Sequence, residues 1–375
     1  MGERPCALEA VVTAMHRVAA RPDPAFWRGR RVLLTGHTGF KGTWLALWLH
    51  QLGADVVGLA LDPPSEPSLF AQTELAPLID DRRIELLDAE AVAAVVQSVQ
   101  PQVVLHLAAQ SLVREGYRRP LQTWNANVLG SLHLLEALRP LQHPCAVVLV
   151  TTDKVYANAE LGKPFCEHDP LGGHDPYSGS KAALELAVAS WRQSYCGDAP
   201  HQTPLLRLGT ARAGNVIGGG DWAADRIVPD AIRALQHGQP VQVRNPGAIR
   251  PWQHVLDPLA GYLLLAERMH ADVAVATAFN FGPDAADQRS VGELVEEMLQ
   301  HWPGGQWLHA AESAAPRESD RLLLDASLAR RVLGWQPRWS FTEAVARTAD
   351  WYQRCLSGDE MRGVCTEQIA AYGLG

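Results

Sequence analysis

Short apolar runs alternate with helical stretches through the first half of the chain. Residues 31–35 have the pattern of a buried strand, and the apolar stretch 43–52 after them is predicted to be a helix. The alternation of strand and helix predicts an α/β fold of the Rossmann type, in which a parallel sheet is doubly wound. Further strand-like runs lie at 55–61, 84–87, 103–107, 146–150 and 205–208.

The pattern changes after about residue 215, where glycine and proline punctuate short strands such as 241–243 and helices such as 291–300. Ser340 and Glu343 have the spacing of a capping box and predict a final helix. We therefore expect three parts with soft boundaries that can interleave. These are an N-terminal extension at 1–24, an NAD-binding Rossmann domain with the catalytic residues at 25–214, and a smaller α/β domain at 215–375 that mainly binds the substrate.

Composition narrows the possible partners. A chain of 375 residues with 47% hydrophobic content can bury one large core or two moderate ones. A net charge of -8 argues against a nucleic-acid or anionic-membrane partner, which would favour a basic face. No apolar run reaches the roughly 20 residues that span a bilayer. The six cysteines show no metal-binding or disulfide spacing, so we expect no metal and a cytoplasmic location.

A glycine-rich loop joins the first predicted strand to the first long helix. Its glycines, Gly36, Gly39 and Gly42, follow the pattern G-x-x-G-x-x-G, with Thr38 and Phe40 between them. The first glycine permits a tight turn, and the others let backbone amides approach a pyrophosphate at the helix N-terminus. The alternative is a structural turn with coincidental glycines. The flanking strand and helix favour a dinucleotide-binding loop.

Three segments after predicted strands are further candidates for cofactor contact. Asp62 can accept hydrogen bonds from a ribose hydroxyl, and no arginine stands in the adjoining residues to bind a 2'-phosphate, so NAD is favoured over NADP. Asp88 could reach the adenine. Both carboxylates can equally be ordinary loop residues. A cofactor can also lie against the turn of Leu107, Ala108 and Ala109, although a close-packed turn explains these residues as well.

Tyr177 and Lys181 put a phenol and an amine four residues apart in a predicted helix. At about 3.6 residues per turn they share one helix face. An ammonium beside a phenol favours the phenolate and lowers its pKa from about 10, so Tyr177 could exchange a proton with a substrate hydroxyl near neutral pH. Such pairs also occur on ordinary helix surfaces, so the neighbouring motifs must decide.

A hydroxyl, a carboxylic acid and an amine follow the fifth predicted strand, in Thr152, Asp153 and Lys154. Open α/β sheets bind their ligands at the carboxyl ends of the strands. Taken alone, Asp153 and Lys154 are best explained as a solvated ion pair in a loop. However, only four of the 33 basic residues are lysines, and three of them, Lys41, Lys154 and Lys181, lie in these motifs. Together the motifs favour a catalytic role.

The combination of glycine loop, Thr-Asp-Lys and Tyr-x-x-x-Lys resembles the extended short-chain dehydrogenases/reductases, the NAD-dependent epimerase/dehydratase family. Within that family the chain looks like the nucleotide-sugar 4,6-dehydratases. The likeness runs from about Phe26 to Tyr352. The strings that resemble the CDP-glucose branch of the group are residues 36–42, 152–154, 212–222 and 250–257.

The resemblance implies a lyase that converts CDP-D-glucose to CDP-4-dehydro-6-deoxy-D-glucose and water through an internal redox cycle on bound NAD. Tyr177 takes the proton of the 4-hydroxyl as hydride leaves C4, and Lys181 lowers the tyrosine pKa and bonds the nicotinamide ribose. By position, Thr152 hydrogen-bonds the 4-oxygen. Asp153 protonates the departing 6-hydroxyl while a base removes the C5 proton, and the hydride then returns to C6.

Lys154 stands where the deoxythymidine-diphosphate-glucose branch carries a glutamate base. A lysine has a reference pKa of about 10.4, which must fall by several units before the amine can accept a proton. Burial beside Lys181 would lower the pKa of Lys154, whereas the adjacent Asp153 would raise it. The alternative is that Lys154 stays charged and stabilises the enolate, while another group removes the proton.

The resemblance also implies substrate contacts in the second half. Asn215 and Arg250 match the family's substrate-binding positions, and an arginine fork suits diphosphate oxygens. Gln110 and Arg114 are expected near the sugar. Each of these residues can also be an ordinary surface or helix-capping side chain.

Other functions share part of this pattern. A 4-epimerase or 4-ketoreductase needs the Tyr/Lys pair but not Asp153 and Lys154, and a 4,6-dehydratase for dTDP-glucose or GDP-mannose would share most motifs. A catalytically silent NAD-binding partner protein predicts damage to the Tyr/Lys pair, which is intact here. The family further implies a homodimer through two helices, one carrying Tyr177, and a place early in deoxysugar synthesis for surface polysaccharide such as lipopolysaccharide.

Overall fold

The fold was analysed in a computed structural model of the chain. It describes residues 20–157, 162–196, 205–275, 277–284, 287–310 and 322–374. Most of the predicted N-terminal extension, residues 1–19, lies outside the described residues. The described chain begins at Ala20, whose amide donates a 2.9 Å hydrogen bond to the carbonyl of Gly334. Helix α1 (Pro24–Trp27) follows and buries Trp27 completely.

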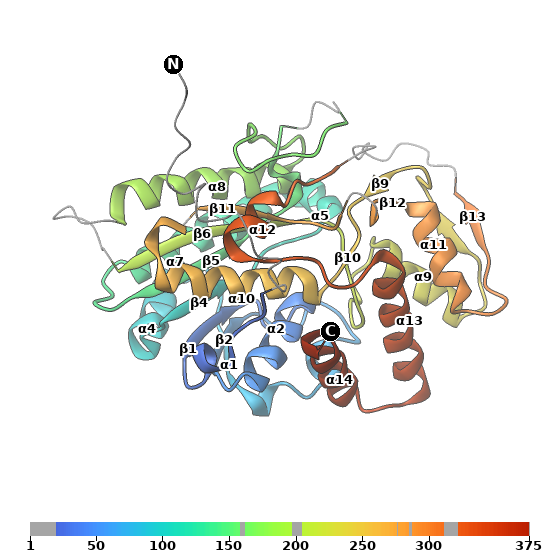
Figure 1. The fold of residues 1–375 in the computed structure, drawn as a ribbon, viewed down its shortest axis with the longest axis horizontal. Coiled ribbons are helices and arrows are strands. Elements are labelled where there is room, and N and C mark those ends of the chain that lie inside the picture. Colours follow the sequence, from blue (N-terminus) through green and yellow to red (C-terminus); the bar gives the residue numbers. More distant parts are fainter. Residues whose placement is uncertain are drawn as a thin grey trace, which may run out of the picture.

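A seven-stranded parallel sheet forms the centre of the described chain (Figure 1). Its order is β11-β6-β5-β4-β1-β2-β3, so the strand order reverses between β1 and β4. This topology confirms the predicted doubly wound sheet and directs its ligand site to the carboxyl ends of β1 and β4. The strands are β1 (Arg31–Thr35), β2 (Asp55–Ala60), β3 (Asp80–Arg83), β4 (Val103–His106), β5 (Cys145–Val150), β6 (Leu206–Ala213) and β11 (Ala278–Phe281).

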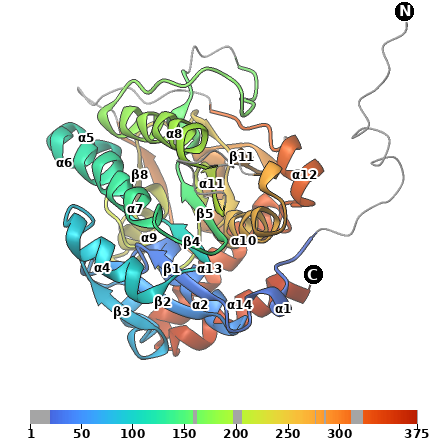
Figure 2. The ribbon, with the colours of Figure 1, turned by 90° about the vertical axis from the view of Figure 1, so that its left-hand side faces the viewer.

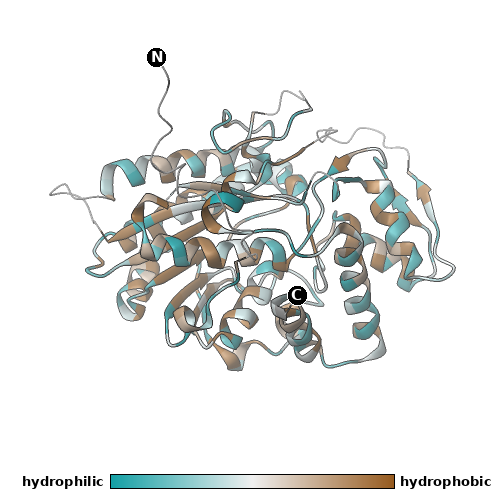
Figure 3. Ribbon diagram, in the orientation of Figure 1, coloured by the Kyte–Doolittle hydropathy of each residue, from teal (hydrophilic) through white to brown (hydrophobic). Residues whose placement is uncertain are grey.

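Helices cover both faces of this sheet (Figure 2). On one face α2 (Phe40–Gln51) and α10 (Leu256–Ala271) pack in the larger hydrophobic cluster. The other face carries α4 (Ala89–Val99), α7 (Gly130–Leu138) and α8 (Pro176–Tyr195). Because both faces are covered, the central strands are apolar throughout rather than alternating, which Figure 3 shows as brown arrows.

The predicted strand at 84–87 is wrong. The third strand is β3 (Asp80–Arg83), immediately before it. Its four residues are all charged, because β3 is the edge strand and exposes much of its surface to water. A strand prediction based on apolar residues therefore fell on residues 84–87 and not on β3.

The second half of the chain contributes both to the central sheet and to a smaller part of its own. Helix α10 packs on β5 and β6, and β11 adds to the edge beside β6. The smaller part contains the predicted strand β8 (Val241–Val243) and the predicted helix α11 (Val291–Gln300). It also contains α9 (Ile227–Gln236), β13 (Trp307–His309) paired with β8, β9 (Ile249–Arg250) paired with β12 (Arg289–Ser290), and β7 (Val216–Ile217) paired with β10 (Gln253–His254).

The helix predicted after Ser340 is present as α13 (Phe341–Ser357), and the Ser340 hydroxyl accepts a hydrogen bond from the Glu343 amide. It is not the final helix, however, because α14 (Met361–Leu374) follows and packs on α2. Shorter helical segments complete the described chain: α3 (Leu69–Gln72), η1 (Ala76–Leu78), α5 (Val113–Arg118), α6 (Pro120–Trp124), η2 (Asn125–Leu129), η3 (Asp153–Val155), η4 (Val273–Val275) and α12 (Ser327–Leu333).

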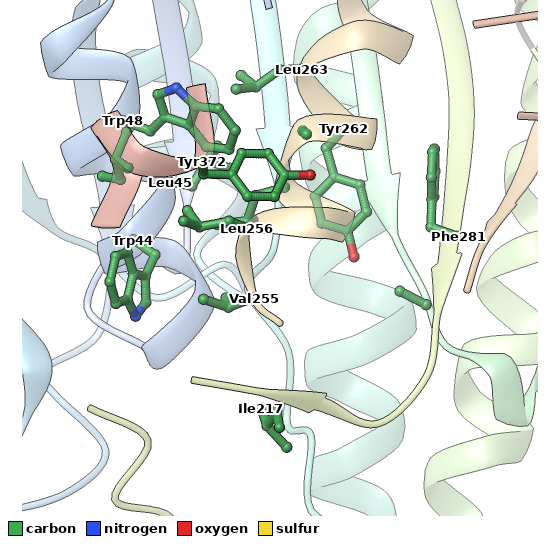
Figure 4. Close-up of a cluster of buried hydrophobic side chains, with 14 of the residues drawn as sticks. Trp44, Leu45, Trp48, Ile217, Val255, Leu256, Tyr262, Leu263, Phe281 and Tyr372 are labelled. Carbon is green, nitrogen blue, oxygen red and sulfur yellow. The ribbon is translucent and has the colours of Figure 1, made fainter. Parts of the chain in front are cut away.

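A shared core joins the two halves, as Figure 4 shows. Trp48 of α2 meets Tyr372 of α14 edge to face, with ring centroids 5.6 Å apart. The Tyr372 hydroxyl donates a 2.8 Å hydrogen bond to Asp257, which lies at the start of α10. Full burial of large side chains such as these contributes roughly 1.5–3 kcal/mol each. The sheet and the C-terminal helices therefore share one core. In the described chain no helix is long and apolar enough to cross a membrane.

Candidate active site

The glycine loop packs directly against the turn after β4. Gly36 has a φ of +77°, and a Cβ placed on it would lie 2.7 Å from the amide nitrogen of Ala108. A Cβ on Gly42 would lie 2.0 Å from the carbonyl oxygen of Gly36. Neither position can hold a side chain without moving the backbone. The structure thus brings two predicted cofactor segments together, the glycine loop and the turn of Leu107, Ala108 and Ala109.

The start of α2 has the features of an anion site. Gly39 occupies the N-cap position and contributes no side-chain cap, so the first amides of the helix are open to a ligand. The Thr38 hydroxyl donates a 3.0 Å hydrogen bond to the carbonyl of Leu61 and ties the loop to the end of β2. Phe40 faces Gly218, where an added Cβ would lie 3.2 Å from its ring. These residues fit the pyrophosphate of a dinucleotide.

The two predicted adenosine contacts differ in their surroundings. The Asp62 side chain is 92% exposed just beyond β2, and Nε of Arg83 lies 3.9 Å from its Oδ1. Asp88 is the N-cap of α4, and its Oδ1 accepts a 3.0 Å hydrogen bond from the amide of Ala91. One oxygen of Asp88 therefore has a capping function, and contact with adenine stays a prediction.

Tyr177 lies in the first turn of α8, and a side-chain cap fixes where this helix begins. Asp175 caps this helix by accepting hydrogen bonds from the amide and hydroxyl of Ser178, at 2.9 and 2.5 Å. Both Tyr177 and Lys181 are buried. The Lys181 ammonium donates a 3.0 Å hydrogen bond to the carbonyl of Val150, the last residue of β5. The pair thus reaches the carboxyl edge of the sheet, where Thr152 begins the next segment.

The protein's own groups do not lower the pKa of Tyr177 as expected. Burial raises the pKa of Tyr177 to about 12, against a smaller opposing effect of the Thr152 hydroxyl. Burial also lowers the pKa of Lys181 to about 8, so this lysine holds its proton less firmly than an exposed one. Desolvation outweighs the attraction between phenolate and ammonium. The phenol therefore needs additional positive charge before it can lose its proton.

Asp153 is a buried acid with one unpartnered oxygen. Its Oδ1 accepts a 3.0 Å hydrogen bond from the Thr152 hydroxyl, while its buried Oδ2 has no partner among the described residues. A Cβ on Gly214 would lie 2.1 Å from this Oδ2. Burial raises the pKa of Asp153, although the positive charge of Lys154 opposes it. The carboxyl group can therefore keep a proton that an exposed aspartate would lose.

The four predicted substrate residues have different surroundings in the structure. Arg250 is buried and close enough to Asp153 to lower the pKa of that carboxyl. Asn215 directly follows Gly214, which lies against the acid, and the Asn215 carbonyl accepts a 3.3 Å hydrogen bond from the amide of Gln253. Arg114 extends to the second half of the chain, with its guanidinium 3.2 Å from the carboxylate of Asp225.

Gln110 instead stabilises a turn. Its Nε2 donates to the Thr123 hydroxyl at 2.8 Å, and its Oε1 accepts from the amide of Leu112 at 2.5 Å. Asn127 bonds both main-chain groups of Gln110 and donates to the Ser180 hydroxyl on α8. These hydrogen bonds give Gln110 a structural function in the turn before α5. Contact with the sugar stays a prediction.

Three charged residues near the site were missed as site residues. Lys41, in the glycine loop, has its pKa lowered to about 8 by burial and by Arg226, whereas Asp153 raises it. Arg226 donates a 2.8 Å hydrogen bond to Asp221 and acts electrostatically on Tyr177. The scarcity of lysine was a usable signal for Lys41. Asp221 lies in a string that carried the family resemblance, but Arg226 had no sequence signal of its own.

A buried ion pair lies beneath the catalytic residues. Glu185, two turns after Tyr177 on α8, accepts hydrogen bonds from Nε and NH2 of Arg212 on β6, at 2.9 and 2.8 Å. The same carboxylate accepts from the hydroxyls of Thr151 and Thr210, at 2.5 and 2.7 Å. This network fixes α8 to β5 and β6, next to the Thr152-Asp153-Lys154 segment.

Comparison with known proteins agrees with this arrangement. Residues 33–348 match the family model of GDP-mannose 4,6 dehydratase. The chain is 42% identical over 352 residues to CDP-glucose 4,6-dehydratase of Salmonella typhimurium, which covers 93% of this chain and 98% of that protein. It is 26% identical over 344 residues to dTDP-glucose 4,6-dehydratase of Haemophilus influenzae, covering 86% and 97%.

The fold also has close counterparts among solved structures. UDP-glucose 4-epimerase of Thermus thermophilus, solved as a complex with NAD, superimposes with a TM-score of 0.73. The two chains are 25% identical, and the match covers 86% of this chain and 99% of that one.

We expect Glu185→Ala to be strongly destabilising, because it leaves the Arg212 charge buried without its partner. Removing one member of a buried pair costs about 3–5 kcal/mol, which corresponds to a fall of several degrees in the melting temperature. Scanning calorimetry measures this loss. The matched control, Glu185→Leu with Arg212→Met, removes both charges and should recover part of it. A wild-type melting temperature for Glu185→Ala would contradict the prediction.

Proposed function

The chain belongs to the GDP-mannose 4,6 dehydratase family of NAD-dependent nucleotide-sugar epimerases and dehydratases, and we propose that it converts CDP-D-glucose to CDP-4-dehydro-6-deoxy-D-glucose and water. One observation carries the assignment to a dehydratase. Asp153, an acid with an unpartnered buried oxygen, stands beside Lys154 at the carboxyl edge where Tyr177 also lies. The 42% identity to a CDP-glucose enzyme supports the choice of nucleotide.

NAD fits the site as the resident cofactor, and when bound it takes hydride from C4 of the sugar and returns it to C6. Gly36 and Gly42 let the loop pack closely, and the uncapped start of α2 at Gly39 offers its first amides to the pyrophosphate. Asp62 is placed to accept hydrogen bonds from a ribose hydroxyl.

Tyr177 accepts the proton of the 4-hydroxyl in the first step. Because burial raises its pKa to about 12, the phenol depends on positive charge from Lys181, Arg226 and the cationic nicotinamide ring to lose its proton. The Thr152 hydroxyl lies close to that of Tyr177, so both can contact the 4-oxygen of the sugar. Lys181 is oriented for this role by its hydrogen bond to Val150.

Asp153 protonates the departing 6-hydroxyl. Burial raises the pKa of its carboxyl, so the acid holds a proton to deliver, and its free Oδ2 can point that proton at the substrate. Thr152 keeps the carboxyl oriented through the other oxygen. The acid is therefore in place before the C–O bond breaks.

We assign removal of the C5 proton to Lys154, which is half-buried directly beside Asp153. This role requires the amine to be neutral when it accepts the proton. The alternative role is a charged Lys154 that stabilises the enolate while another group removes the proton.

The substrate diphosphate is assigned to Arg250 and Asn215, with Arg114 and Gln110 toward the sugar. Arg250 offers a buried guanidinium near Asp153, and an arginine fork matches phosphate oxygens. A 4-epimerase shares the fold but does not require Asp153 and Lys154, and dTDP-glucose or GDP-mannose are the alternative substrates. The product would enter deoxysugar synthesis for surface polysaccharide such as lipopolysaccharide, in the cytoplasm.

A homodimer is supported by apolar side chains that face solvent beside the catalytic helix. Leu186 on α8 is 61% exposed and Leu121 on α6 is 78% exposed, and the two helices pack against each other. Trp124 and Leu129 add further apolar surface on the same side of the fold. Such a patch on neighbouring helices fits a second copy of the chain.

The central test uses purified protein, NAD and a panel of nucleotide-glucose substrates with mass detection. We expect CDP-glucose to yield a product lighter by one water, with a 4-ketone and a C6 methyl group, without accumulation of NADH. Tyr177→Phe should lower the rate by roughly a hundredfold or more, because it removes the proton acceptor. Loss of water from none of the substrates would refute the dehydratase assignment.

Lys154→Ala separates the two roles of this lysine. If Lys154 is the base, hydride still reaches the cofactor and gives a transient NADH absorbance, while exchange of the C5 proton with deuterated solvent stops. Lys154→Arg serves as the control, since it keeps a positive charge but cannot act as a base near neutral pH. Exchange that continues undiminished in Lys154→Ala would remove the base role.

Leu186→Arg is expected to convert a dimer to a monomer, because it places a charge in the apolar patch on α8. Light scattering coupled to size-exclusion chromatography gives the mass. Leu356→Arg, at a 49% exposed leucine on α13, is the matched control and should leave the mass unchanged. A wild-type protein that is monomeric would contradict the proposal.

A further inference from the structure

An arginine distant in sequence stands beside the carboxylate expected to recognise the cofactor ribose. Asp62 lies just after β2, and Arg83 is the last residue of β3, the neighbouring strand at the sheet edge (Figure 2). The guanidinium Nε is 3.9 Å from Oδ1 of Asp62. Because β2 and β3 are parallel, both side chains lie at the carboxyl edge where the adenosine ribose is expected.

The Arg83 guanidinium is already held in place by groups other than Asp62. Its NH1 donates a 2.9 Å hydrogen bond to the carbonyl of Leu61, and its NH2 donates a 2.9 Å hydrogen bond to Oδ2 of Asp81. The face of the guanidinium lies 4.7 Å from the ring centroid of Phe70. Asp81 is fixed in turn by a 2.7 Å hydrogen bond with His37 of the glycine loop. Loss of the Asp62 carboxylate would leave these contacts intact.

Asp62 and Arg83 would act on NAD and NADP in opposite ways. A ribose with free hydroxyls can donate hydrogen bonds to the Asp62 carboxylate. A 2'-phosphate at the same position would be repelled by Asp62 and attracted by the charge of Arg83, whose Nε faces the Asp62 carboxylate. The Arg83 side chain is 33% exposed, so its charge is accessible to a ligand.

We propose that Arg83 is a preformed site for a 2'-phosphate, which the exposed Asp62 carboxylate keeps closed to NADP. The inference rests on the NAD site assigned above. In this proposal Asp62 sets the preference for NAD over NADP. Substitution of Asp62 would make Arg83 available to a 2'-phosphate.

The test measures binding of NAD and of NADP to the full chain by isothermal titration calorimetry, without sugar substrate. Wild type should bind NAD more tightly than NADP. Asp62→Ser should bind NADP about tenfold to a hundredfold more tightly than wild type, the range expected for a hydrogen bond to a charged group. Because the phosphate contact is electrostatic and exposed, the gain should shrink as salt is added.

A double substitution shows whether Arg83 is responsible. In Asp62→Ser with Arg83→Gln the gain in NADP affinity should disappear, while Asp62→Ser with Arg83→Lys should keep part of it because the charge remains. Melting temperatures check folding, and Asp62→Ser should match wild type because the Asp62 side chain is 92% exposed.

Three outcomes would overturn the proposal. The first is an Asp62→Ser variant that gains no NADP affinity, and the second is a gain that survives Arg83→Gln. The third is a wild type that already binds NADP as tightly as NAD. These results would leave the dehydratase assignment untouched, whereas a wild type that binds neither cofactor would contradict that assignment and this inference together.

Discussion

The buried Glu185–Arg212 ion pair holds the catalytic helix to the sheet. Both side chains are almost fully buried, and the carboxylate accepts four hydrogen bonds from Arg212, Thr151 and Thr210. A buried charge pair is tolerated only when such bonds satisfy it, so the geometry of α8 relative to β5 and β6 is narrowly defined. Tyr177 and Lys181 lie on that helix, and Asp153 follows β5. The positions of the reacting groups therefore depend on this pair.

A second constraint is the presence of glycines where the two halves of the chain pack together. Gly219 lies against Trp351, with an added Cβ only 1.9 Å from the indole, and Gly214 lies against Asp153. Any side chain at Gly214 would displace the Asp153 carboxyl group, to which the acid role is assigned. Small residues thus let the second half pack closely on the sheet, where Arg250 lies near Asp153.

Desolvation governs the chemistry of the enclosed groups. Burial raises the pKa of Tyr177 and Asp153 and lowers that of Lys41 and Lys181, so every one of these groups is shifted toward its neutral form. The neutral form suits Asp153, to which the role of an acid that must keep its proton is assigned. A phenol that must lose its proton instead depends on added positive charge, which the Tyr/Lys spacing by itself did not reveal.

The amino-acid sequence alone determined the doubly wound sheet, the glycine loop and the Tyr/Lys and Thr-Asp-Lys motifs, because apolar periodicity and short-range spacing are local properties. It failed at β3, whose charged residues reflect an edge position that only the assembled sheet defines. It also could not assign Gln110 to a turn, place Arg83 beside Asp62 or bring Arg226 near Tyr177. These outcomes depend on contacts between residues far apart in the chain, and those contacts exist only once the strands have paired and the second half has packed on the sheet.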